Sequence, residues 1–138
     1  MERVTATYEG GLRFDVRVRD LVFTVDQTRE DGGTGAGPMP SELLAGALAA
    51  CMGMDVAYYC SKVGLDASGM SVEADLTTSD DKPYRAVEFR VRMIMPNTEI
   101  GKRHEALLRV AEKCYVHNSL AADPQVSVTI SGRDETHD

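Results

Sequence analysis

Residues 40–64, PSELLAGALAACMGMDVAYYCSKVG, decide the fold of this chain. Twelve consecutive small or apolar residues occupy positions 43–54, so this half of the segment is apolar on nearly every side of a helix. Ser41 is a suitable N-cap, and Gly64 suits a left-handed C-cap. The pattern predicts one long helix over residues 42–63, buried on several sides. Its apolar run is too short to cross a bilayer.

The helix also carries small residues that form a low-relief surface, namely Ala45, Gly46, Ala49, Ala50 and Gly53. Each glycine costs about 1 kcal/mol relative to alanine inside a helix, so close approach of another backbone is expected to offset the cost. That backbone belongs either to a second copy of the chain or to the protein's own sheet. The sequence leaves both possibilities open.

The length and composition indicate one domain, spanning residues 1–138, with a core that needs no disulfides. The formal net charge of −7 argues against a nucleic-acid partner. The first ten residues lack the apolar region of a signal peptide, so we expect a cytoplasmic protein without a membrane partner. Three cysteines are an odd number, which favours reduced thiols over a structural disulfide framework.

Alternation of apolar and polar residues predicts six strands and a second, amphipathic helix that carries Cys114 on its apolar stripe. The expected strands cover residues 3–9, 12–18, 21–25, 70–77, 87–93 and 126–130, and the second helix covers residues 99–116. Gly10-Gly11 is a two-residue turn signal. The order βββ-α-ββ-α-β predicts an α+β fold with antiparallel pairing. Residues 134–138 are expected to be frayed.

Cys51, near the centre of the long helix, is the first candidate for chemistry. It is either a small buried hydrophobic residue or a reactive thiol, which needs a nearby positive charge and a second thiol to resolve a sulfenic acid. Cys60 is nine residues away, so it points to the opposite side of the helix, roughly 13 Å along the axis. Cys114 is sterically able to meet Cys51, but the spacing does not show that it does.

Two segments, PSELLAGALAACMGMDV and AEKCYVHNSLA, resemble the OsmC/Ohr family of thiol-dependent peroxidases. The resemblance implies that Cys51 is the peroxidatic cysteine and Cys114 the resolving one. It also implies the OsmC-like fold and an intertwined homodimer with two active sites at the subunit interface. No metal or organic cofactor is implied.

The resemblance further implies an arginine from the N-terminal region that lowers the thiol pKa. Arg13 is the best match, and Arg17 and Arg19 on the same strand face are alternatives. Glu42 resembles the glutamate that holds this arginine. It lies about 180° around the helix from Cys51, so it would serve a site completed by the partner subunit. The alternative is a solvated first-turn glutamate favoured by the helix dipole.

Two departures place the chain closer to a divergent OsmC-like branch. Ser41 stands where the best-characterised branch has its glutamate, and Tyr115 replaces the proline expected after the resolving cysteine. Cys60 is an additional thiol.

We expect a peroxidase that reduces organic hydroperoxides to alcohols and is recycled by a dithiol or a lipoylated protein. The competing hypothesis is a non-catalytic small-molecule binding protein with an interface pocket. A hydrolase that uses Cys51 and His117 lacks an orienting third group. A zinc site at Cys114-x-x-His117 lacks two further ligands.

Overall fold

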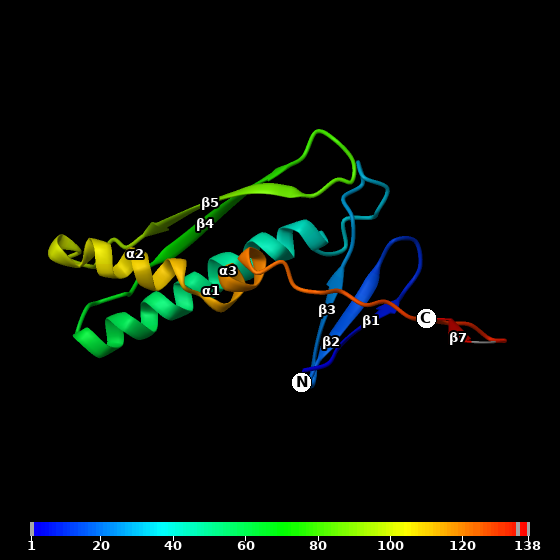
Figure 1. The fold of residues 1–138 in the computed structure, drawn as a ribbon, viewed down its shortest axis with the longest axis horizontal. Coiled ribbons are helices and arrows are strands. Elements are labelled where there is room, and N and C mark those ends of the chain that lie inside the picture. The colour runs from blue at the N-terminus through cyan, green and yellow to red at the C-terminus, as the bar shows by residue number, and fades with distance from the viewer. Residues whose placement is uncertain (1, 135, 138) are drawn as a thin grey trace.

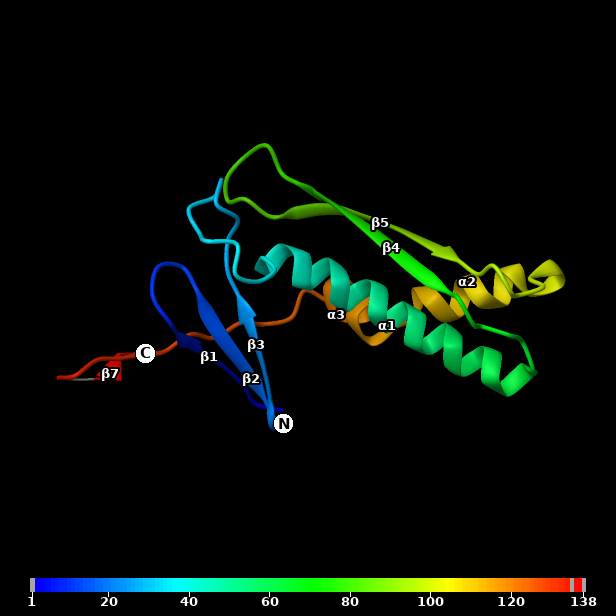
Figure 2. The ribbon, with the colours of Figure 1, turned by 180° about the vertical axis from the view of Figure 1, so that it is seen from behind.

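The computed structural model describes residues 2–134 and 136–137 and confirms an α+β fold with antiparallel strand pairing. A three-stranded sheet, a long helix, a two-stranded sheet and a helical segment follow one another along the chain (Figure 1, and from behind in Figure 2). The elements are β1 (Val4–Tyr8), β2 (Phe14–Val18), β3 (Leu21–Val25), α1 (Pro40–Val63), β4 (Ser71–Thr78), β5 (Ala86–Ile94), η1 (Gly101–Arg103), α2 (His104–Glu112), α3 (Tyr115–Ala121), β6 (Ile130–Ser131) and β7 (Thr136–His137).

The strands β1, β2 and β3 form the predicted antiparallel meander, but the first turn is longer than predicted. A two-residue turn at Gly10-Gly11 would place Tyr8 opposite Arg13. The structure instead pairs Tyr8 with Phe14, and their ring centroids are 5.5 Å apart. The longer turn keeps the apolar side chains of β1 and β2 on one face, because a one-residue slip in register would reverse the faces.

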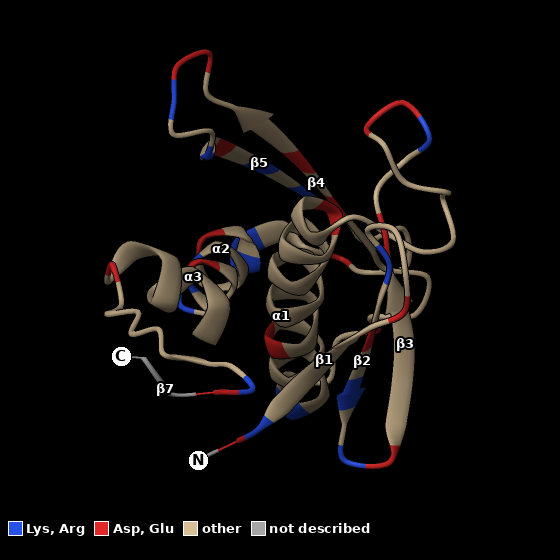
Figure 3. Ribbon diagram, turned by 90° about the vertical axis from the view of Figure 1, so that its right-hand side faces the viewer, with Lys and Arg blue, Asp and Glu red and all other residues tan. Residues whose placement is uncertain are grey.

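One face of this sheet is apolar throughout, and apart from the buried Val25 most of it is left open by the rest of the chain. The register aligns Val4, Ala6, Tyr8, Phe14, Val16, Val18, Leu21, Phe23 and Val25 on that face. Val4 is 58% exposed and Tyr8 is 60% exposed. In Figure 3 the ribbons of β1 and β3 carry no charge along their length. An apolar sheet face of this size is typical of a surface that packs against another molecule.

The helix α1 begins two residues earlier than predicted, at Pro40. Proline is favoured at the first helical position because it lacks the N–H that would be unsatisfied there. Met39, not Ser41, is the N-cap, and its backbone N–H donates to Glu42 Oε1 at 2.8 Å. The helix ends at the predicted left-handed glycine, Gly64, with φ of 77°.

Within this chain α1 is buried on one face only. Its buried side chains are Ala45, Leu48, Met52, Val56 and Cys60, and they pack against β4, β5, α2 and α3. The opposite face exposes apolar side chains, among them Leu44, Met54 and Tyr58. Both helix glycines face β4: a Cβ at Gly53 would lie 3.3 Å from Val72, whereas Gly46 borders a cavity between α1 and β4 and has nothing within 4 Å.

By length and composition alone, α1 could cross a membrane. It has 24 residues, and its most apolar window has a mean hydropathy of 1.5 with 33% of that window buried. The core helix of a globular protein passes the same test.

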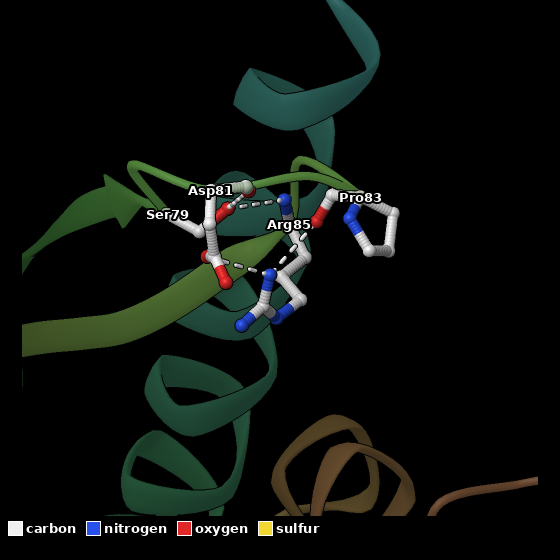
Figure 4. A network of polar contacts seen from close by, with 4 residues as sticks. All are labelled: Ser79, Asp81, Pro83 and Arg85. Carbon is white, nitrogen blue, oxygen red and sulfur yellow. Dashed lines mark hydrogen bonds and ion pairs between the residues drawn. The ribbon is translucent and has the colours of Figure 1, made fainter.

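The hairpin β4–β5 forms as predicted and covers α1. Its connecting turn is held by Arg85, whose guanidinium donates to Asp81 Oδ1 at 3.1 Å and to the Pro83 carbonyl at 2.8 Å (Figure 4). Ser79 Oγ donates to the Asp81 carbonyl and accepts from the Arg85 N–H. These contacts fix the turn, although the exposed ion pair adds little stability.

The predicted second helix is broken into two helices, so the prediction of one helix over residues 99–116 was wrong. The break falls at Lys113 and Cys114, where Cys114 adopts an extended conformation with φ of −70° and ψ of 156°. Cys114 is the N-cap of α3, and its Sγ accepts from the His117 N–H at 3.3 Å. Helical periodicity does not reveal this break because apolar residues continue through it.

The predicted last strand over residues 126–130 is mostly absent. Only Ile130 and Ser131 pair, with Thr136 and His137. After α3 the chain runs on the side of the molecule where the β1–β3 sheet lies, away from β4 and β5 (Figure 1 and Figure 2). Of the tail predicted to be frayed, residues 135 and 138 lie outside the described residues.

The glycine-rich loop that leads into α1 is organised by Asp26, which the sequence did not single out. Its carboxylate accepts from the N–H groups of Gln27, Thr34 and Ala36 and from Thr34 Oγ1. The side chain is 2% exposed. These bonds lower the pKa of Asp26 from 3.8 to about 2, with the Thr34 hydroxyl as the largest cause.

Two glycines allow the loop to close around this carboxylate. A Cβ at Gly33 would lie 2.2 Å from the Gln27 carbonyl oxygen, and one at Gly37 would lie 2.1 Å from that of Thr24. Both positions therefore exclude any side chain. The loop is a defined structure that connects β3 to the start of α1.

We predict that Asp26→Asn lowers the melting temperature at pH 7 by several degrees, because the amide replaces an acceptor with a donor among N–H groups. The ionised carboxylate stabilises the fold above pH 3.8, and this contribution is lost as the pH falls through about 2. The difference in melting temperature between variant and wild type should therefore become smaller as the pH is lowered. Thermal denaturation at several pH values measures this difference.

Asp31→Asn is the matched control, because Asp31 is exposed and bonds only with Thr28. It should leave the melting temperature nearly unchanged. An Asp26→Asn gap that stays constant from pH 7 down to pH 2 would contradict the role assigned to the carboxylate.

Candidate active site

Cys51 lies on α1 at the border between the buried face and the exposed apolar face. It is half-buried, and its neighbours Leu48 and Met52 belong to the core. Leu44 and Tyr58, seven residues before and after it, are exposed, and so is Met54. Seven residues are close to two helical turns, so these side chains share one face with Cys51. The thiol is therefore accessible from the side of α1 that this chain leaves open.

Cys114 meets Cys51 from the break between α2 and α3. It is 0% exposed and packs in the same hydrophobic cluster. The two thiols are free and close enough that Cys51 affects the ionisation of Cys114. At the break Cys114 has an extended N-cap conformation and its Sγ accepts from the His117 N–H, while the side chain packs in the cluster that contains the buried face of α1.

The environment of Cys114 keeps it protonated near neutral pH. Burial raises its pKa, and Cys51 raises it further, whereas the N–H groups of His117 and Val116 lower it. Of these effects burial is the largest. A buried, protonated thiol is a poor first nucleophile, so of the two cysteines Cys51 is better placed to attack a substrate.

Cys60 is a core side chain. It is 1% exposed on the buried face of α1, and burial raises the pKa of its thiol. It belongs to the same cluster as Cys51 but lies nine residues further along the helix, so a disulfide between the two would require the helix to unwind. A neutral packing thiol fits this position.

The predicted arginines do not reach Cys51 in this chain. Arg13 and Arg17 are exposed, and the β1–β3 sheet makes no extensive contact with α1. Arg13 follows the first turn and Arg17 lies in β2 on the polar sheet face, whereas Arg19 is in the turn after β2 with φ of 54°. Arg19 thus lies outside the regular strand, so the alternation predicted for the strand does not determine the face on which its side chain lies.

Glu42 also remains apart from Cys51 within the chain. Its carboxylate accepts from the Met39 N–H and so caps α1. This contact agrees with the alternative role of a first-turn glutamate at the positive end of the helix dipole. It borders a cavity of about 540 Å³ between α1 and β4, together with Ser41, Gly46 and Ala49. Any contribution of Glu42 to a thiol site would have to come from another copy.

A larger apolar groove of about 770 Å³ lies between β5 and the helices, and the sequence did not indicate it. His117 lines this groove, and its Nδ1 is buried without a hydrogen-bond partner. His117 contacts the Cys114 sulfur through its backbone N–H. Within residues 2–134 and 136–137, no group of three or more His, Cys, Asp or Glu is placed to hold a metal ion.

The arrangement provides one accessible thiol backed by one buried thiol. Such a pair can form a disulfide after oxidation of the accessible sulfur, since the sulfenic acid of one cysteine condenses with the thiol of the other. Hydrolytic chemistry has less support, because no contact in the described part of the chain joins the His117 ring to Cys51.

The comparison with known proteins agrees with the family resemblance seen in the sequence. The family model for OsmC-like proteins matches residues 32–129. No curated protein matches the chain.

Solved structures with a similar fold share low sequence identity with the chain. A candidate osmotic stress induced and detoxification response protein from Psychrobacter arcticus 273-4 is 24% identical, with a TM-score of 0.79 over 86% of this chain and 88% of that one. An OsmC-like protein from Mycoplasma pneumoniae is 18% identical, with a TM-score of 0.74 over 88% and 87%. An organic hydroperoxide resistance protein from Legionella pneumophila is 22% identical, with a TM-score of 0.64 over 87% and 88%.

We predict that a mild alkylating reagent modifies Cys51 at least about tenfold faster than Cys60 or Cys114 in the folded protein, because only Cys51 is accessible. Peptide mass spectrometry after timed labelling measures the three rates. Labelling in denaturant is the control and should make the rates similar. Equal labelling of Cys60 and Cys51 in the folded protein would contradict the assigned burial.

Proposed function

The chain belongs to the OsmC-like protein family, and we propose that it is a thiol-dependent peroxidase that reduces organic hydroperoxides to alcohols. The observation that carries the proposal is the meeting of the accessible Cys51 with the buried Cys114 across α1 and the α2–α3 break. The Legionella pneumophila relative described as an organic hydroperoxide resistance protein supports the substrate class.

In the first step the Cys51 thiolate attacks the distal oxygen of the hydroperoxide. The O–O bond breaks, sulfur is oxidised to a sulfenic acid, and the alkoxide leaves and takes a proton to become the alcohol. The exposed apolar side chains of Met54 and Tyr58 lie on the same face of α1 and provide an environment for the organic group.

In the second step the Cys114 thiol condenses with the Cys51 sulfenic acid. An S–S bond forms and one water molecule leaves. An external dithiol, such as a lipoylated protein, then reduces this disulfide and is itself oxidised to a disulfide. The raised pKa of Cys114 is compatible with this order, because Cys114 is needed only after Cys51 has been oxidised.

The proposal includes a homodimer, in which a second copy supplies the charge that Cys51 lacks. Two features support it: the apolar face of the β1–β3 sheet and the exposed apolar face of α1 around Cys51 are both uncovered. Packing one on the other between copies would bury both faces and bring the end of the β1–β2 hairpin close to the partner's α1. Arg13 lies beside the turn at that end on the polar face, so its long side chain would have to reach the partner's thiol around the end of the hairpin. There Arg13 would stabilise the thiolate and the charge on the leaving oxygen.

A binding protein without peroxide chemistry is the second candidate function. The observation that favours it is the absence of any arginine at Cys51 within the described chain, together with an open apolar face beside the thiol. Such a protein would keep the interface pocket, and Cys51 would show no fast reaction with hydroperoxides.

We predict fast turnover of cumene hydroperoxide by the purified protein with dihydrolipoamide as reductant, and slower turnover of hydrogen peroxide. Cys51→Ser should reduce the rate at least about 100-fold, because it removes the nucleophile. Cys114→Ser should stop recycling through the disulfide and leave a sulfenic acid that dimedone traps. Consumption of peroxide and mass spectrometry of the trapped species measure these outcomes.

Cys60→Ala is the matched control, since Cys60 packs in the same cluster without reaching Cys51. It should retain most of the activity with some loss of thermal stability. No turnover by the wild-type protein, with Cys51 inert toward mild alkylation, would exclude the peroxidase and favour the binding protein.

We predict that Arg13→Gln lowers kcat/KM for the hydroperoxide by about 10- to 100-fold, because a fixed positive charge beside the thiolate is lost. The pH at which Cys51 becomes reactive should rise in parallel, measured by the rate of alkylation across pH. Arg13→Lys should restore part of the effect.

Arg17→Gln and Arg19→Gln are the controls on the same hairpin. They should leave both kcat/KM and the pH profile close to those of wild type. If one of them produced the larger loss, that arginine and not Arg13 would serve the site.

A further inference from the structure

The short helix α3 is held at its start by a sulfur atom. Cys114 is its N-cap, and the Cys114 Sγ accepts from the backbone N–H of His117 at 3.3 Å. An N-cap acceptor satisfies one of the N–H groups that the first turn of a helix leaves unpaired. The atom that holds α3 is therefore the same atom that the proposed function oxidises to a disulfide.

Apart from this cap, few contacts hold α3 in place. It has seven residues, none of which is buried, and a helix of this length is marginal without support from packing. Val116 packs against the hydrophobic cluster, and the side chain of Asn118 donates to the Lys113 carbonyl at 3.1 Å. These two contacts do not involve a sulfur, so they do not depend directly on the redox state of Cys114.

The side chain of His117 destabilises the first turn of α3. In the described part of the chain, its Nδ1 is the only buried side-chain nitrogen or oxygen without a hydrogen-bond partner. Such a group lowers stability, because it has lost its bonds to water and gained none in return. Unwinding of the first turn would return this nitrogen to water. The turn is thus stable only while its other contacts, the Cys114 cap among them, outweigh this cost.

Formation of a disulfide removes the basis of the cap. A disulfide places its two sulfurs about 2.05 Å apart and fixes the torsion about the bond near 90°. The Cys114 sulfur then takes its position from Cys51 on α1 rather than from the N–H of His117. It can also no longer ionise, so the stronger, charge-assisted form of this hydrogen bond is lost.

Reduction of the disulfide requires access to the buried sulfur. A dithiol can attack either sulfur, and the attack is faster when the thiol that leaves has the lower pKa. Burial raises the pKa of Cys114, so its thiolate is a poor leaving group, whereas the proposed function makes Cys51 the stabilised thiolate. The favoured attack is therefore on Cys114. Because Cys114 is 0% exposed, a dithiol reaches it only if α3 moves.

We propose that α3 is a redox-sensitive switch, which the Cys114 cap keeps closed in the reduced protein and which opens at its first turn when Cys114 is joined to Cys51. Opening exposes the Cys114 sulfur. A thiolate of the dithiol bonds to it, the S–S bond breaks, and Cys51 leaves as a thiolate. The second thiol of the reductant then displaces Cys114, which takes up the proton that this thiol gives up, and α3 is capped again. The inference rests on the proposed function and adds to it the step by which the reductant gains access.

The direct test compares hydrogen exchange of α3 in the reduced form and in the disulfide form. All chains carry Cys60→Ala, so Cys51 and Cys114 are the only thiols, and diamide forms the disulfide without any hydroperoxide. Loss of an N-cap corresponds to about a 3- to 30-fold change in helix opening, so the amides of residues 117–121 should exchange faster by that factor in the disulfide form. The amides of β4 and β5 should exchange at the same rate in both forms.

Two variants serve as controls. Cys114→Ser keeps an oxygen at the N-cap but cannot form the disulfide, so diamide should leave the exchange of α3 unchanged. Asn118→Ala removes the bond to the Lys113 carbonyl, which does not involve sulfur, and should speed the exchange of α3 to a similar extent with and without the disulfide.

The outcomes separate the switch from the proposed function. Equal exchange of α3 in the reduced and disulfide forms would overturn the switch and leave the peroxidase proposal intact. Failure of diamide to join Cys51 to Cys114 would contradict the second step of the proposed function, and the switch with it.

A second test locates the attack by an external thiol. The disulfide form is treated briefly with 2-mercaptoethanol, and mass spectrometry after acid quenching finds the mixed disulfide. The switch predicts that it forms on Cys114. A mixed disulfide mainly on Cys51 would show that reduction proceeds without the opening of α3.

Tyr115→Pro tests the opening itself. Tyr115 is 80% exposed at the first position of α3, where proline is favoured, and the extended backbone of Cys114 is compatible with a following proline. Because proline opposes unwinding, reduction of the disulfide by dihydrolipoamide should slow about 3- to 10-fold. Formation of the sulfenic acid at Cys51 should change by less than about twofold, since that step precedes the opening. Equal slowing of both steps, or no slowing of reduction, would contradict the switch.

Discussion

The packing of α1 against β4, β5, α2 and α3 is the interaction on which the rest of the structure depends. Leu48, Met52 and Val56 occupy the contact, and burying side chains of this kind contributes roughly 1.5–3 kcal/mol each. The contact fixes the rotation of α1 and therefore leaves Cys51 at its border. It also holds α2, so the break after α2 brings Cys114 to the first thiol.

The same rotation of α1 leaves the chain incomplete on its other side. The exposed stripe of α1, the apolar face of the β1–β3 sheet and the segment 125–131 are three apolar surfaces without cover. Burial of apolar surface is the main driving force for folding and association, so surfaces of this kind favour a second copy. The proposed dimer and the proposed active site are thus linked, because the open face of α1 is also the side from which a substrate would approach Cys51.

The loop between β3 and α1 gives the helix a fixed start. Asp26 gathers the backbone of the loop, and Gly33 and Gly37 allow the close approach that this requires. A flexible loop would let the first turn of α1 fray, and the bond from Met39 to Glu42 would then lose its geometry. Loop and cap together stabilise the half of α1 that precedes Cys51.

The sequence by itself determined the α+β class, the long helix ending at Gly64, the β1–β3 meander and the β4–β5 hairpin, because each depends on local periodicity and turn residues. Periodicity missed the break at Cys114 and the carboxylate cage of Asp26, because both depend on contacts between residues that no short pattern relates. The resemblance to the family selected Cys51 and Cys114, and only the tertiary structure brought the two thiols together. It alone also showed that Arg13 lies apart from Cys51 in one chain, since proximity between a sheet and a helix is set by how they pack, whereas helical periodicity had already separated Glu42 from Cys51.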